Sequence, residues 1–305
     1  MSDFNVHILG CGSALPTVAH LPSSQVVELR GKLYMIDCGE GAQRQMRLQR
    51  LSFGKLVAIF ISHLHGDHCF GLPGLISSLG MLGRTGDLHI IGPVGLKRFL
   101  EPILELFCDQ MAYRVVLTET DTRQAQTVWE DRSVTISTIP LKHRTPTQGY
   151  LFREKVTPLH LDKASADFYG IPLAAYPAIL RGEDFVSEVG EEVIPNSRLT
   201  KRGREARSYA YCSDTSYLPN NAPLIKGVTL LYHEATFLTS ESARAGQTGH
   251  STAREAALMA QSAEAKRLLI GHYSARYHAT DDLLAEARAI FPCTEAANEG
   301  MCLEL

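Results

Sequence analysis

The sequence predicts an α/β protein that folds as a four-layer α/β/β/α sandwich with an inserted arm. Short strand-like runs followed by helical patterns occur twice along the chain, which is the order of elements that such a sandwich requires. Some runs, such as Leu56–Ile61, hold no polar residue, as strands buried on both faces do. Regular pattern is lost between Glu154 and Arg207, which predicts a long insertion there.

The first half of the chain alternates predicted strands and helices. The apolar strand Leu56–Ile61 ends at Ser62, where a group of histidines begins. Gly71–Leu82 has the pattern of an apolar helix, which tolerates Pro73 in its first turn. We expect further strands at Val6–Leu9, Ser24–Leu29, Leu33–Ile36, His89–Ile91, Arg114–Leu117, Val134–Ile139 and Gly149–Phe152, and further helices at Gly41–Arg50 and Gly95–Phe107.

Regular pattern returns after the insertion. Thr252 and Glu255 have the spacing of a capping box, which predicts that a helix begins there. Within the insertion itself we expect one short helix, near Lys163–Tyr169. The remaining expected elements are strands at Ser208–Cys212, Val228–Tyr232 and Leu268–Ile270, and a closing helix at Asp281–Ile290.

Length and composition favour one large cytoplasmic domain. A chain of 305 residues with 45% hydrophobic content can bury a single large core, so we expect one domain over residues 1–305, with the arm at 154–207. The net charge of −3 argues against a general nucleic-acid coat protein. We see no signal peptide and no membrane-spanning segment. The seven cysteines show no Cys-x-x-Cys spacing, which favours reduced thiols in the cytoplasm.

The strongest chemical signal is the run from Ser62 to His68. It places three imidazoles and one carboxylate, those of His63, His65, Asp67 and His68, directly after a buried strand. Backbone geometry at a strand end can aim all four side chains into one cavity, and Gly66 allows a sharp turn between the two pairs. Imidazole nitrogens and carboxylate oxygens suit Zn²⁺, and they also fit Mn²⁺ or Fe.

This His-x-His-x-Asp-His run after an apolar strand resembles the signature of the metallo-β-lactamase superfamily. The resemblance implies two metal sites and says where the other ligands stand. His143 is expected to join His63 and His65 at the first site, and His272 to join Asp67 and His68 at the second. Asp214 is expected to bridge the two metals. Each of these three residues lies just past an apolar run, although a histidine taken alone is more often structural than functional.

Further blocks resemble the ribonuclease Z family, the transfer-RNA 3′-endonucleases. They extend over nearly the whole chain, and the paired His-Ser-Thr and Ser-x-Arg-Tyr blocks are much more specific than the metal motif. The resemblance implies a zinc-dependent endoribonuclease that cleaves the 3′ trailer from transfer-RNA precursors. It also implies a homodimer and an arm that binds the transfer RNA. The blocks are Asp37–Gln45, Gly71–Leu75, Glu234–Phe237, Gly249–Ala253 and His272–Tyr277.

Three residues are candidates for the chemistry beyond metal binding. Asp67 is placed to accept the proton of an attacking water as well as to bind metal. His250, just before a helix, is placed to donate a hydrogen bond to the phosphoryl group or to the leaving 3′-oxygen. Glu234 is a candidate for orienting His250. The alternatives are a structural helix-start histidine and a buried structural carboxylate.

Basic residues near these motifs are candidate phosphate contacts. Arg44 lies in a helix where arginines recur every three residues, and Arg202 and Arg204 belong to a basic stretch before Asp214. Arg276 stands in the Ser-x-Arg-Tyr block. For the two stretches, an ordinary solvated face is the alternative, whereas a neighbouring metal site that must attract a phosphodiester favours binding.

The chain departs from the family pattern in places that touch no proposed metal ligand. Leu173–Pro177 stands in the arm where a Gly-Pro pair is expected, and the following stretch is acidic. His20-Leu21-Pro22 replaces a common Arg-Asn pair, and Gly271 replaces a usual serine before His272. The departures in the arm weaken the expectation of tight binding to the transfer-RNA elbow.

Two competing functions fit parts of the sequence. Another hydrolase of the same fold, acting on small phosphodiesters, thioesters or lactams, fits the metal cluster equally well but the His-Ser-Thr block less well. A non-catalytic binding protein with structural metals is the rival from a different class, and it is disfavoured because all seven expected ligands are present.

Overall fold

The computed structural model describes residues 4–108, 110–155, 159–186, 193–201 and 205–305. The chain divides into two compact units, one formed by residues 1–153 and 207–305 and the other by residues 154–206. We call the first the core unit and the second the arm. Among the described helices, none is long and apolar enough to cross a membrane.

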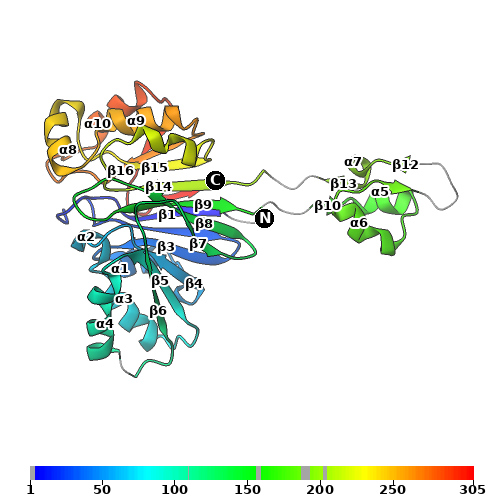
Figure 1. The fold of residues 1–305 in the computed structure, drawn as a ribbon, viewed down its shortest axis with the longest axis horizontal. Coiled ribbons are helices and arrows are strands. Elements are labelled where there is room, and N and C mark those ends of the chain that lie inside the picture. Colours follow the sequence, from blue (N-terminus) through cyan, green and yellow to red (C-terminus); the bar gives the residue numbers. More distant parts are fainter. Residues whose placement is uncertain (1–3, 109, 156–158, 187–192, 202–204) are drawn as a thin grey trace. The chain divides into compact units, whose positions relative to one another are not determined.

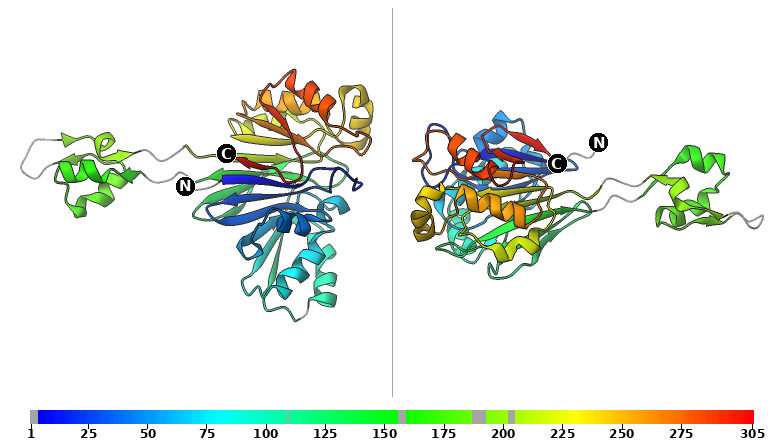
Figure 2. Two further views of the ribbon diagram at one scale, coloured as in Figure 1. Left: turned by 180° about the vertical axis from the view of Figure 1, so that it is seen from behind. Right: turned by 90° about the horizontal axis from the view of Figure 1, so that it is seen from above.

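The first sheet of the core unit has the strand order β18-β1-β2-β3-β4-β5-β6. Strands β3 to β6 run parallel, so their carboxyl ends lie at one edge of the sheet. The first and last strands of the chain, β1 and β18, are neighbours (Figure 2). The strands are β1 (Phe4–Gly10), β2 (Ser24–Leu29), β3 (Lys32–Cys38), β4 (Leu56–Phe60), β5 (Leu88–Pro93), β6 (Val115–Thr120) and β18 (Cys302–Glu304).

The second sheet has the order β17-β16-β15-β14-β9-β8-β7. Strands β14 to β17 run parallel, and β9 pairs with β14 in the antiparallel sense. The strands are β7 (Thr127–Glu130), β8 (Val134–Pro140), β9 (Gln148–Glu154), β14 (Ser208–Cys212), β15 (Leu230–Glu234), β16 (Leu268–Gly271) and β17 (Thr294–Ala296).

Helices cover the outer faces of both sheets, so the predicted four-layer sandwich is confirmed (Figure 1). Aromatic rings such as Phe60, Tyr150 and Phe152 meet edge to face between the sheets and form the inner core. A second core lies between the first sheet and its helices. The helices are α1 (Ala42–Leu48), α3 (Leu72–Met81) and α4 (Leu96–Phe107) over the first sheet, and α9 (Ala253–Ser262) and α10 (Asp281–Arg288) over the second.

The expected elements are largely confirmed, and the missed ones are short or exposed. Ser24–Leu29 and Ser208–Cys212 agree residue for residue with β2 and β14. The capping box of Thr252 and Glu255 at the start of α9 is also confirmed. Strand β7 was not expected, because it is half exposed at the sheet edge and lacks an apolar pattern. Short helices α2 (Gly66–Cys69) and α8 (Ser242–Thr248) were also not expected.

The arm contains more structure than its sequence suggests. It has a small apolar core of its own, which includes Ile171, Ile179 and Leu199. The expected short helix is present as α5 (Lys163–Phe168), where Asp162 caps the helix start. The other elements are β10 (His160–Leu161), α6 (Tyr176–Leu180), β11 (Phe185–Val186), β12 (Val193–Ile194), α7 (Asn196–Leu199) and β13 (Thr200–Lys201).

Candidate metal centre and active site

The seven expected ligands follow the carboxyl ends of four strands, one in the first sheet and three in the second. The segment after β4 carries His63 and His65 and leads into α2, which carries Asp67 and His68. His143 follows β8, and Asp214 follows β14. His272 follows β16. The structure therefore brings all seven side chains together at the edge where the parallel strands end.

The first cluster contains His63, His65, His143 and Asp214, whose donor atoms all lie within 4.8 Å of one another. His63 Nε2 lies 2.9 Å from His65 Nδ1. Asp214 Oδ2 lies 3.6 Å from His63 Nε2 and 3.7 Å from His143 Nε2. This is the spacing of donor atoms that surround one common point.

The second cluster contains Asp67, His68 and His272. The other oxygen of Asp214, Oδ1, lies 3.2 Å from His68 Nε2 and 3.1 Å from His272 Nε2. Asp67 Oδ2 lies 3.4 Å from His68 Nε2 and 3.7 Å from His272 Nε2. The two carboxylate oxygens of Asp214 thus face different clusters, which is the geometry of a carboxylate shared by two cations.

The donor atoms fit a pair of divalent metal ions. Among the described residues, the buried Nε2 atoms of His68, His143 and His272 have no hydrogen-bond partner. Buried polar atoms are rarely left unpaired, because desolvation without a compensating bond costs free energy. Unpaired ring nitrogens that converge on carboxylates have the chemistry of a metal centre of the zinc type.

A second set of residues fixes the orientation of the ligands, as is usual around protein metal sites. Asp37 is fully buried, and its Oδ2 lies 2.7 Å from His68 Nδ1 and accepts hydrogen bonds from Ser62 and Tyr211. His272 Nδ1 lies 2.9 Å from Thr236 Oγ1. His143 Nδ1 lies 2.8 Å from the Gly249 carbonyl oxygen, to which it can donate. Each contact leaves Nε2 free to face the centre.

Asp37 and Thr236 were not predicted as functional residues, although both stand in sequence blocks that resemble the family. Their roles become visible only in the structure, through their contacts with His68 and His272 and, for Asp37, through its backbone conformation. Asp37, His272 and Ala14 all have positive φ, at 54°, 61° and 43°, a conformation that non-glycine residues rarely adopt. Such conformations cluster at functional sites, where the surrounding structure enforces them.

Electrostatics keeps most ligands in the form that binds metal. Burial lowers the pKa of His63, His65 and His143, which favours the neutral imidazole. Burial alone would also lower the pKa of His68, but the charges of Asp214, Asp37 and Asp67 outweigh it and raise that pKa well above the usual value. For Asp67 the effect of burial is likewise outweighed, and nearby His68 and His272 lower its pKa.

His250 and Glu234 form a buried pair beside this centre. His250 Nδ1 lies 2.9 Å from Glu234 Oε1, and Glu234 also accepts hydrogen bonds from Thr215 and Thr236. The His250 ring lies 4.9 Å from the ring of His143 and 5.4 Å from that of His272. Burial would lower the pKa of His250, but the charge and hydrogen bond of Glu234 raise it to about 9.

The candidate RNA contacts have different surroundings. Arg276 forms a 2.7 Å ion pair with Glu241, and its guanidinium lies over the ring of Phe237. Arg44 is exposed on α1. Arg202 and Arg204 lie outside the described residues.

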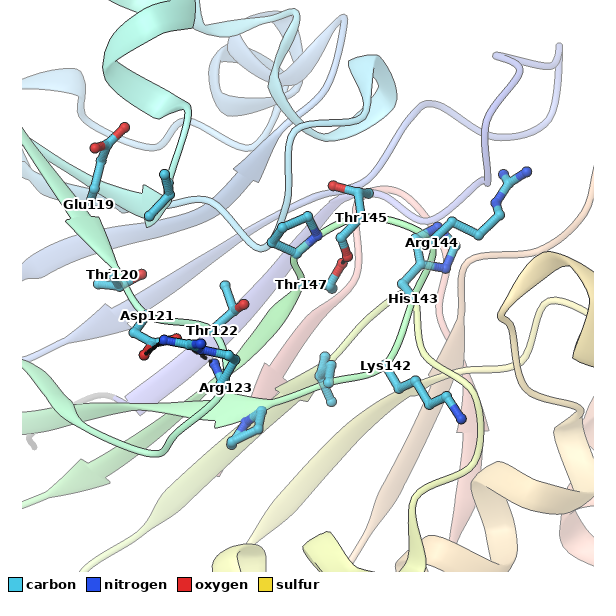
Figure 3. A pocket seen from close by; sticks show the side chains of 14 residues that line it. Glu119, Thr120, Asp121, Thr122, Arg123, Lys142, His143, Arg144, Thr145 and Thr147 are labelled. Atoms are coloured by element: carbon cyan, nitrogen blue, oxygen red, sulfur yellow. Dashed lines mark hydrogen bonds and ion pairs between the residues drawn. The ribbon is translucent and has the colours of Figure 1, made fainter.

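Two clefts open beside the metal ligands. One of about 800 Å³ is lined by the turn at Thr120–Arg123 and by the loop from Pro140 to Thr147, which carries His143 (Figure 3). The other, of about 430 Å³, is lined by His65 and Asp67. Arg144 lines both clefts. It ends the short run Lys142-His143-Arg144, in which only His143 was singled out from the sequence.

This sandwich, with histidines and carboxylates gathered at its strand ends, defines a protein of the metallo-β-lactamase fold. A solved neighbour described as the metallo-β-lactamase fold protein YhfI from Bacillus subtilis superposes with a TM-score of 0.68 at 19% identity, covering 99% of this chain and 100% of that one. A family model described as anti-Pycsar protein Apyc1 matches residues 4–149, slightly less than half of the chain.

Relatives over the full length are more specific. The chain is 59% identical to ribonuclease Z of Porphyromonas gingivalis over 305 residues, which covers 100% of both sequences. The structure of human tRNase Z, short form, is 26% identical with a TM-score of 0.69, and the match covers 98% of each chain. The chain belongs to the ribonuclease Z family.

Proposed function

We propose that this protein is a metal-dependent endoribonuclease that removes the 3′ trailer from transfer-RNA precursors. Cleavage leaves a 3′-hydroxyl on the transfer RNA and a 5′-phosphate on the trailer. One observation carries the proposal most directly: in a chain of this family, the oxygens of Asp214 face two donor clusters, with the His250–Glu234 pair alongside.

The chemistry of the centre depends on both metals and side chains. The first cluster and the second cluster would each hold a divalent ion, and such ions would lower the pKa of a water molecule and stabilise negative charge on a phosphoryl group. Asp67, at the edge of the second cluster, accepts the proton of the attacking water. The backbone N–H of Ala14 donates a 2.8 Å hydrogen bond to Asp67 Oδ2 and so restricts rotation of that carboxylate.

His250 supplies the proton on the leaving side. Glu234 engages its Nδ1 and leaves Nε2 to face the substrate. A protonated imidazole there donates to the leaving 3′-oxygen as the phosphorus–oxygen bond breaks. No 2′-hydroxyl is consumed, because water is the nucleophile.

Zinc is the proposed metal, with two ions per chain. Five imidazoles and two carboxylates make up the proposed donor set, and imidazole-rich sets with carboxylates suit Zn²⁺. Manganese and iron fit the same donors. Metal analysis of protein purified without added metal distinguishes them.

The proposed assembly is a cytoplasmic homodimer. The apolar face of α3 is buried against the first sheet, through Leu72, Leu75 and Leu79, so this face is core rather than interface. Large apolar side chains are exposed near the ends of α3 and α4 instead, where Met81 is 79% and Phe107 is 70% accessible. An exposed apolar surface of this kind favours a protein contact.

The RNA is proposed to run through the two clefts past Arg144. The charges of the larger cleft are partly paired internally, since Asp121 forms an ion pair with Arg123 and Glu119 accepts hydrogen bonds from Gly95 and Lys97. Arg144 shows no ion pair within the described chain and projects from the loop beside His143 (Figure 3). Exposed Arg44 and the arm, including Arg202 and Arg204, are proposed as additional RNA contacts, while Arg276 requires release from Glu241 to contact RNA.

Cleavage of a precursor with mapped product ends tests this function. Metal-loaded protein is incubated with a transfer-RNA precursor that bears a 3′ trailer, beside an Asp67→Ala variant. We expect one cut next to the discriminator base, a 3′-hydroxyl on the transfer RNA, and no cut with the variant. Turnover of a lactam or thioester without precursor cleavage would instead support the rival hydrolase.

A further inference from the structure

The loop formed by residues 11–22, which we call the front loop, borders the cleft that contains Asp67. Ala14, Pro16 and Pro22 line that cleft together with His65 and Asp67. The loop reaches the metal centre through one hydrogen bond, from the Ala14 N–H to Asp67 Oδ2 at 2.8 Å. That same oxygen faces His68 and His272, so the bond acts on the atom that points into the second cluster.

A single carboxylate, that of Glu299, holds both ends of the front loop. Its Oε1 accepts a 2.8 Å hydrogen bond from the Leu21 N–H and a 3.3 Å bond from the Cys11 N–H. Its Oε2 lies 3.0 Å from His20 Nδ1. The side chains of His20 and Glu299 are 15% and 12% accessible, so these contacts are largely shielded from water. Glu299 lies 278 residues beyond Leu21, in the turn that precedes β18.

Backbone hydrogen bonds also hold the neck of the front loop, by which we mean the place where its two ends meet. The Gly12 N–H donates to the Leu21 carbonyl at 2.9 Å and closes the loop. Ser13 and Cys11 exchange hydrogen bonds with Tyr273, the residue after His272, at 3.0 and 3.1 Å. Ala14 therefore stands at the first position beyond a clamped neck, with φ at 43°. An alanine persists in that conformation only where its surroundings enforce it.

The cluster of Cys11, His20 and Glu299 is complete without a bound ion. Its donor atoms lie within 4.8 Å of one another, as in a metal site. However, the Cys11 thiol donates to the Ala297 carbonyl at 3.4 Å, and burial raises the pKa of that thiol well above its usual value. Burial would raise the pKa of Glu299, but His20 and the Leu21 N–H lower it, so the carboxylate is ionised. The polar atoms of these three groups therefore have hydrogen-bond partners within the protein, and together they hold the two ends of the front loop in place.

We propose that Glu299, paired with His20, is a positioning residue for Asp67. Glu299 fixes the neck of the front loop, the neck fixes the Ala14 N–H, and the N–H holds Asp67 Oδ2 toward the second metal site. The inference rests on the proposed function in that Asp67 is taken as a ligand of this site. It gives His20 a role at the position where the chain departs from the Arg-Asn pattern of the family.

The test compares Glu299→Ala and Glu299→Gln with a matched control, Glu295→Gln. Glu295 lies four residues earlier and forms a partly exposed ion pair with Arg267, so its loss perturbs the same segment without touching the front loop. Two quantities are measured without RNA: the affinity for the second zinc equivalent, by competition with a chromophoric chelator, and amide hydrogen exchange of residues 11–22 in the metal-free protein. Steady-state kinetics on the precursor supplies the third.

We expect Glu299→Ala to bind the second zinc about 10- to 100-fold more weakly, in the range typical when a group that orients a ligand is lost. The first equivalent should bind as in the unaltered protein. Exchange in the front loop should accelerate, and kcat should fall more than KM rises. Glu299→Gln keeps an acceptor oxygen for the two N–H groups, so its zinc affinity and loop exchange should lie between those of Glu299→Ala and the unaltered protein. Glu295→Gln should leave both quantities and the kinetics unchanged.

Unchanged affinity for the second zinc in a folded Glu299→Ala variant with faster loop exchange would overturn the inference, because the clamp would then be structural only. If Glu299→Ala does not fold, Glu299→Gln and His20→Gln decide by the same two measurements. Failure of the proposed function gives a different result: the unaltered protein would cleave no precursor, whereas the metal-affinity difference between variants would persist.

Discussion

At the scale of single residues, the candidate site depends on pairs in which a second group orients the first. Asp37 orients His68, Thr236 contacts His272, and Glu234 engages His250. The orienting groups are themselves buried and hydrogen-bonded, so they hold their partners in one rotamer. Function is therefore expected to be sensitive to residues that never touch RNA.

The His250–Glu234 pair gives a prediction at this scale. His250→Ala should lower kcat for precursor cleavage by about 10²- to 10⁴-fold, since it removes a positioned proton donor. Glu234→Gln should cause a smaller loss, and the double variant should be no slower than His250→Ala, because the two residues act as a unit. Steady-state kinetics checks this.

A chemically matched pair serves as the control. His7 contacts Glu28 at 3.3 Å on neighbouring strands β1 and β2, and His7→Gln should leave kcat unchanged. Additive losses in the His250/Glu234 double variant would contradict the idea that Glu234 acts through His250.

At the scale of elements, the metal ligands at the strand ends could be predicted from the sequence, whereas the contacts that orient these ligands could not. The ligands His63, His143, Asp214 and His272 each follow an apolar run, and parallel strands place their carboxyl ends together, so the centre could be predicted from pattern and family order. The roles of Asp37 and Glu299 depend on positive φ or on contacts across hundreds of residues. Neither leaves a local pattern in the sequence.

One family departure has a packing explanation at this scale. Gly271 ends β16, next to His272, and a Cβ added there would lie 2.4 Å from the hydroxyl and 2.6 Å from the ring of Tyr232. Tyr232 stacks on Tyr211, whose hydroxyl donates to Asp37. The usual serine is therefore incompatible with the tyrosine that occupies this core.

Gly271→Ser should accordingly reduce the free energy of unfolding by about 1–3 kcal/mol, the typical cost of overpacking a core. Combined with Tyr232→Leu, it should cost less than the sum of the two single changes, since the larger ring is gone. Denaturant unfolding measures all three variants. Gly246→Ala in α8, where the added Cβ meets nothing within 4 Å, is the control and should be neutral or slightly stabilising. Strict additivity would refute the packing explanation.

At the scale of the whole molecule, the arm is inserted between two paired strands. Arg153, one residue before the end of β9, is paired with Ser208 at the start of β14, so the strand ends that flank the arm are neighbours in the sheet. The core unit and the arm each have their own apolar core. We propose that the core unit carries the chemistry and that the arm carries substrate affinity.

Replacing residues 155–206 with a short Asn-Gly turn tests this division, since such turns join paired antiparallel strands. The shortened protein should keep its thermal unfolding midpoint and turn over a small chromogenic phosphodiester at close to the original rate. Its kcat/KM for a transfer-RNA precursor should fall by about 10-fold or more, because phosphate contacts are lost. An unchanged kcat/KM for the precursor would show that the arm contributes no affinity.

We propose that one carboxylate, that of Asp214, is shared by two metal sites at the strand ends. Counting bound metal per chain, by elemental analysis after dialysis against metal-free buffer, tests it most directly. The unaltered protein should retain two equivalents of zinc, and Asp214→Ala should lose tight binding at both sites while circular dichroism shows the same fold. A single equivalent in the unaltered protein, or two equivalents retained by Asp214→Ala, would contradict the shared-carboxylate centre.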